Sequence, residues 1–188
     1  VCSSDLATGV GDLRTARELA VGIVTALEGD RLGYNAGILG AAVAGLMSAE
    51  GDADGAYEVL LRCWRFEAER DDRFYHRCLA PDLVRLALAL GHDEVAAEVA
   101  GVVAEGVALA PGVPTVRGLA LRCRGLVLDD PELLLEAVAV ARTVPHRVEH
   151  AGVSEDAESS LALRGRLDEA TTLLTEARSE EHSSELPV

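Results

Sequence analysis

The sequence contains no lysine, and all 17 of its basic residues are arginine. A phosphate-binding loop of the G-x-x-x-x-G-K-[ST] type needs a lysine to reach the phosphates, so this chain cannot contain that motif. Acidic residues number 32, which gives a formal charge of −15 at pH 7. Because a surface of this sign repels nucleic-acid phosphates and anionic lipids, we expect neither direct nucleic-acid contact nor membrane binding.

Cysteine and aromatic residues are also scarce. The four cysteines, at positions 2, 63, 78 and 123, match no zinc-finger, zinc-ribbon or C-x-x-C redox spacing. Such scattered thiols are typical of reduced, packed side chains, which favours a cytoplasmic location. The longest apolar run, from Ala36 to Met47, is too short to cross a bilayer. No catalytic residue and no cofactor site is expected.

What the chain does contain is helical periodicity almost throughout, with apolar residues at i, i+3, i+4 and i+7. This pattern predicts an all-α fold, since alternation typical of strands is weak. A helix is also expected to begin at Pro81, because proline is tolerated in a first turn. The other expected helices span residues 13–27, 35–50, 53–69, 94–109, 115–127, 130–143, 145–164 and 167–177.

Three turns of similar form indicate that these helices pair as hairpins. In each turn a glycine ends one helix and an acidic residue opens the next: Gly51, Gly91 and Gly165 suit the left-handed C′ position. The second helices recur every 36 to 41 residues, which lies in the range of helical-hairpin repeats. Residues 170–177 resemble the second helix of a tetratricopeptide repeat. The expected architecture is a right-handed stack of about four antiparallel hairpins.

Both ends of the chain resemble translated sequencing adapter. The adapter sequence GTG TGC TCT TCC GAT CT would encode residues 1–6, and its partner AGA TCG GAA GAG CAC would encode residues 178–182. We therefore expect segments 1–6 and 178–188 to be artefacts around a helical-repeat domain at 7–177, cut at both ends, with a charge near −12. Cut ends should expose Leu173 and Leu174 on one side and Ile23 and Leu27 on the other, and so favour self-association.

A set of motifs spread over about half of the chain has a fixed order. It consists of P-D-L-V-R-L-A-L-A-L-G at 81–91, D-D-P-E-L-L-L-E-A-V at 129–138, and residues 120–126, 155–157, 161–162 and 165–170. In these motifs the chain resembles the helical-repeat region of large LuxR-type ATP-binding transcriptional regulators of actinobacteria. The resemblance implies an ATPase domain before this segment and a DNA-binding helix-turn-helix after it. It also implies that this segment is a non-catalytic sensor for a protein or small-molecule effector.

Five of the six aromatic residues gather between positions 57 and 75, interleaved with arginines. Tryptophan, tyrosine and arginine dominate binding hot spots, so this segment is a candidate partner or effector surface. The alternative is a helix pair with buried aromatics and a solvated charged face. The candidate surface residues are Tyr57, Arg62, Trp64, Arg65, Phe74 and Tyr75.

Two further patterns have a chemical and a structural interpretation. His146, Glu149 and His150 spell H-x-x-E-H, an inverted zinc-protease motif, although surface histidines are the simpler interpretation. The acidic run at Glu155, Asp156 and Glu158 is interpreted as a solvated face rather than paired catalytic carboxylates. The favoured function is the regulator segment; a repeat-based interaction module of another cytoplasmic scaffold and a helical metallohydrolase fragment are the alternatives.

Overall fold

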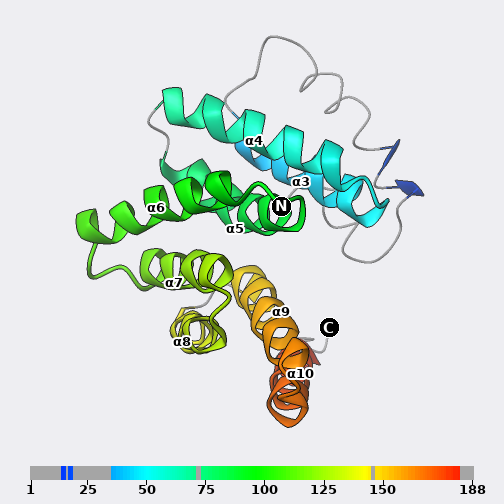
Figure 1. The fold of residues 1–188 in the computed structure, drawn as a ribbon, viewed down its shortest axis with the longest axis vertical. Coiled ribbons are helices and arrows are strands. Elements are labelled where there is room, and N and C mark those ends of the chain that lie inside the picture. The colour runs from blue at the N-terminus through cyan, green and yellow to red at the C-terminus, as the bar shows by residue number, and fades with distance from the viewer. Residues whose placement is uncertain (1–13, 16, 19–34, 71–72, 145–146, 183–188) are drawn as a thin grey trace, which may run out of the picture. The chain divides into compact units, whose positions relative to one another are not determined.

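The computed structural model describes residues 14–15, 17–18, 35–70, 73–144 and 147–182 (Figure 1). In these segments the chain forms eight labelled α-helices and no strand, which confirms the all-α class. The helices are α3 (Ala36–Ala49), α4 (Ala53–Glu69), α5 (Arg73–Ala89), α6 (Asp93–Leu109), α7 (Pro114–Leu128), α8 (Pro131–Ala141), α9 (Arg147–Leu163) and α10 (Leu167–His182). The expected helix at 13–27 lies largely outside the described residues.

The chain divides into two compact units, residues 1–99 and 100–188. In the first, α3 packs on α4 and both pack on α5 (Figure 1). Helix α4 begins where the Asp52 side chain accepts a hydrogen bond from Gly55 N at 3.0 Å, a standard N-cap. Its buried face carries Ala56, Leu60 and Cys63 at helical spacing, and this apolar stripe fixes which side of α4 faces its neighbours.

The expectation that a helix begins at Pro81 is wrong, because α5 runs through that proline without interruption. An interior proline costs a helix about 3 kcal/mol, since it removes one backbone hydrogen bond and crowds the preceding turn. The flanking residues Leu79, Ala80 and Leu83 are fully buried against α3 and α4. Burial of these side chains on two neighbouring helices outweighs the local cost.

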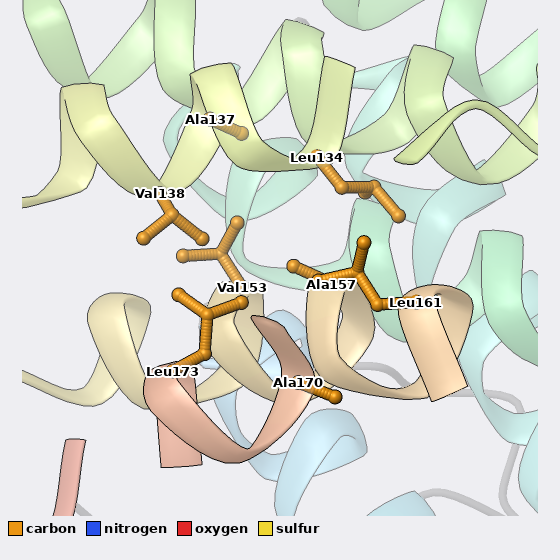
Figure 2. Close-up of a cluster of buried hydrophobic side chains, with 8 residues drawn as sticks. All are labelled: Leu134, Ala137, Val138, Val153, Ala157, Leu161, Ala170 and Leu173. Atoms are coloured by element: carbon orange, nitrogen blue, oxygen red, sulfur yellow. The ribbon is translucent and has the colours of Figure 1, made fainter. Parts of the chain in front are cut away.

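In the second unit, α7 packs on α8, α8 on α9 and α9 on α10. Gly125 of α7 permits the closest approach, since a Cβ there would lie 2.9 Å from the Leu134 side chain. The unit's hydrophobic core is drawn from three helices and is shown in Figure 2. Its members are Leu134, Ala137 and Val138 of α8, Val153, Ala157 and Leu161 of α9, and Ala170 and Leu173 of α10.

The turns between paired helices share one backbone motif. Gly51, Gly91 and Gly165 have φ values of 86°, 77° and 73°, which confirms the predicted left-handed position. The next backbone N–H in each turn donates to the carbonyl five residues back, as in 92→87 and 166→161. Asp129 (φ 51°) takes the left-handed position in the α7–α8 turn, where no glycine marked it. Aspartate is one of the few residues that tolerate this conformation.

The spacing of the hairpins also agrees with the sequence. The second helices begin at residues 53, 93, 131 and 167, so the intervals are 40, 38 and 36 residues. All three fall in the predicted range of 36 to 41, and three of the pairs, α3 with α4, α7 with α8 and α9 with α10, pack on each other. The right-handed stacking of all four hairpins stays a prediction.

One expectation about the ends is wrong. Leu173 is only 8% exposed and belongs to the core of the second unit, next to Val153 in Figure 2. It is buried because α10 turns this side towards α9, its own hairpin partner. Leu174, the next residue, is half-buried, whereas Ile23 and Leu27 lie outside the described residues. No helix in the described segments is long and apolar enough to cross a membrane.

Candidate interaction site

Two of the predicted surface aromatics are core residues. Tyr57 and Trp64 on α4 are 8% and 4% exposed. Their seven-residue separation places both on the face of α4 that also buries Leu60. A partner therefore cannot reach these two rings in the folded unit, and the structural interpretation of the aromatic cluster holds for them.

Two histidines that sequence reasoning missed stack on these rings. His92, in the α5–α6 turn, lies on Tyr57 with centroids 4.6 Å apart and an interplanar angle of 15°. His76, near the start of α5, lies on Trp64 at 4.1 Å and 22°. The His76 Nε2 atom is also 3.1 Å from the Trp64 carbonyl oxygen. The two stacks thus mark opposite ends of the α4–α5 contact, a pairing that no local sequence signal could reveal.

The remaining candidates have different positions. Arg65 is exposed and Arg62 half-buried on α4, so an arginine-bearing edge does reach the surface. Phe74 and Tyr75 lie in the first turn of α5, but their side chains are outside the described part of the structure. Next to this edge, Phe66 is half-buried and the Arg70 guanidinium lies 5.3 Å from its ring centroid, within the range of a cation–π contact.

A carboxylate is buried between α4 and α3. Glu67 is fully buried on α4, and its Oε1 atom accepts a hydrogen bond from Gly37 N of α3 at 3.0 Å. Asn35, the residue at the N-cap of α3, makes no side-chain cap. Glu67 therefore supplies from another helix the acceptor that a local N-cap would provide, and the positive end of the α3 dipole stabilises its charge.

Cys63 lies one helical turn before Glu67 and packs against Gly40 of α3. Burial and, to a smaller extent, the nearby Glu67 carboxylate raise the pKa of its thiol to about 11, while Arg62 acts in the opposite direction. The thiolate is the nucleophilic form, so Cys63 is unreactive at neutral pH. The Cys63 side chain therefore serves to pack α4 on α3.

In the second unit, charged side chains join successive hairpins. Arg122 of α7 donates to Asp156 of α9 at 2.6 Å, and both side chains are largely buried (11% and 3% exposed). Arg164 and Arg166 in the α9–α10 turn reach back to Asp129 and Glu132 at 2.7 and 2.6 Å. All three pairs join residues 34 or 35 positions apart, close to the 36-residue interval between the two hairpins, so they link neighbouring hairpins.

The pairing of Asp156 corrects the interpretation of residues 155–158 as a solvated face. Glu155 is exposed as expected, but Asp156 points into the unit, where the Arg122 guanidinium compensates its charge. Gly152, one turn earlier, makes room for that guanidinium, since a Cβ there would lie 3.0 Å from one of its nitrogens. The carboxylate therefore holds α9 against α7 through this ion pair, and it is not placed for acid–base chemistry.

The H-x-x-E-H pattern begins at the N-terminal end of α9. His146 and Glu149 lie outside the described side chains, whereas His150 is half-buried. Among the side chains that the structure does describe, no group of three or more His, Cys, Asp or Glu is placed to hold a metal ion. The zinc-site interpretation stays a prediction.

Comparison with known proteins found similar solved structures. No protein-family model matches the sequence, and no curated protein matches it. One similar solved structure contains the nearly identical TPR-like repeats of a kinesin light chain from Podospora anserina, with 18% identity and a TM-score of 0.49. That match covers 98% of this chain and 94% of the other. A substituted form of the same repeats gives 17% identity, a TM-score of 0.49 and coverage of 97% and 92%.

Proposed function

We propose that this chain is a non-catalytic interaction segment built from helical-hairpin repeats. The observation that carries the proposal is the repeated turn, which closes four hairpins with the same backbone hydrogen bond. Hairpins of this kind cannot bury their apolar faces alone, and their arrays present extended faces that proteins use for binding. The described ion pairs between hairpins in the second unit support a scaffold role, because these charged side chains hold neighbouring hairpins together.

The finer proposal is that the segment belongs to a LuxR-type ATP-dependent transcriptional regulator. This proposal is supported by the sequence resemblance over residues 80–177, which includes both surface and core positions. Leu83, Leu134 and Leu161 from the resembling stretches are fully buried in their units. In such a regulator, effector binding on the repeats would be coupled to an ATPase before them and a DNA-binding domain after them.

Long-read sequencing of the source DNA across both ends tests this context. The regulator proposal expects an open reading frame that continues into a phosphate-binding loop upstream and a basic helix-turn-helix downstream, with segments 1–6 and 178–188 absent. A frame that runs into further repeats would instead favour another cytoplasmic scaffold. A frame encoding both end segments and stopping there would refute the adapter interpretation and leave a small free-standing helical protein.

For the first unit, we propose that the arginine-bearing edge of α4 is the partner or effector surface, with Arg65 and Arg62 as its described members. Phe74 and Tyr75 belong to the same proposed surface. The buried rings of Tyr57 and Trp64 stabilise this surface, because their stacks with His92 and His76 hold α4 against α5. Tyr57 and Trp64 are left out of this surface because both rings are buried in the core of the unit.

The metallohydrolase alternative has a direct test. Protein prepared in zinc-supplemented medium is dialysed and its metal content measured by atomic emission. The alternative expects about one zinc per chain, lost in a His146→Ala/His150→Ala variant, because two histidines and a further ligand are the minimum protein set. Metal-free protein would remove this alternative and leave the interaction proposal unchanged.

A further inference from the structure

We draw no further inference here: the strongest candidate, the outer face of α6 where the exposed carboxylates of Glu98 and Glu105 flank the exposed Val102, runs across the division of the chain into its two units, and nothing in the structure shows what covers it.

Discussion

Among single side chains, Glu67 has the clearest consequence because its buried carboxylate caps a helix to which it does not belong. Replacement by alanine would leave the buried Gly37 N–H without this acceptor. An unsatisfied buried donor costs about 1–3 kcal/mol, so we expect Glu67→Ala to lower the unfolding free energy by this amount. Urea titration followed by the fluorescence of Trp64, the sole tryptophan, reports on the same unit.

Glu67→Gln is the matched control for that prediction. A glutamine keeps an oxygen acceptor of nearly the same size, so its loss of stability should be the smaller of the two. If both variants were equally destabilised, the negative charge at the end of α3, and not the acceptor, would be the feature that matters.

The cysteines give a second prediction, on reactivity. The Cys63 thiol is buried and its pKa is raised to about 11, so nearly all of it stays protonated at pH 8, whereas Cys78 is exposed on α5. We expect iodoacetamide at pH 8 to alkylate Cys78 quickly and Cys63 only in urea, because the thiolate is the reacting form. Peptide mass mapping after timed quenching separates the sites. Fast alkylation of Cys63 in folded protein would show that α3 and α4 open locally.

Two glycines of one helix allow a matched test of how closely α3 and α4 pack. Gly40 and Gly45 lie in the same helix, α3, but a Cβ at Gly40 would be 2.4 Å from Cys63 Sγ, whereas nothing lies within 4 Å at Gly45. We expect Gly40→Ala to destabilise the unit by about 1–3 kcal/mol through overpacking. Gly45→Ala should stabilise it by about 0.5–1 kcal/mol, because alanine loses less backbone entropy. Changes of the same sign in thermal unfolding would contradict the close α3–α4 approach.

Helices also show where reasoning from the sequence succeeds. The boundaries of α4 follow directly from the Asp52 cap and the apolar stripe, and the expected range 53–69 is the observed one. Pro81 was misplaced because the cost of an interior proline is local, whereas the burial that overrides it comes from α3 and α4. At the start of α8, the Asp130 side chain accepts a hydrogen bond from Glu132 N at 2.9 Å and so caps the helix from a neighbouring position in the sequence.

Between hairpins, the two kinds of ion pair should contribute very differently. Asp156→Ala would leave the buried Arg122 guanidinium uncompensated, which typically costs about 3–5 kcal/mol. Glu176→Ala breaks the Arg142–Glu176 pair, whose side chains are 41% and 48% exposed, and pairs of this kind contribute at most about 1 kcal/mol. Far-UV circular dichroism must follow the urea titration, because no aromatic residue occurs after position 75.

The double variant Arg122→Met/Asp156→Ala completes that comparison. Removing both charges should recover much of the loss in Asp156→Ala, because no buried charge is then left without its partner. Strict additivity of the two single variants would mean that the pair does not couple α7 to α9.

The candidate surface could be predicted only in part, for a physical reason. Local sequence shows that aromatics and arginines alternate between positions 57 and 75, but it does not show which helix face each one takes in a packed unit. The structure places Tyr57 and Trp64 in the core because His92 and His76, from other segments, complete their contacts. The arginines stay at the surface because a guanidinium is costly to bury without a partner.

The sequence was sufficient for everything that depends on near neighbours along the chain: the helical class, the glycine turns, the hairpin spacing and the caps. These features are decided within about one helical turn by backbone conformation and side-chain periodicity. The tertiary structure alone decided the features that depend on distant segments: a helix capped by Glu67, a proline kept inside α5 and an aspartate buried against Arg122. In each of these the deciding energy is burial or charge compensation supplied by another helix, which no local pattern records.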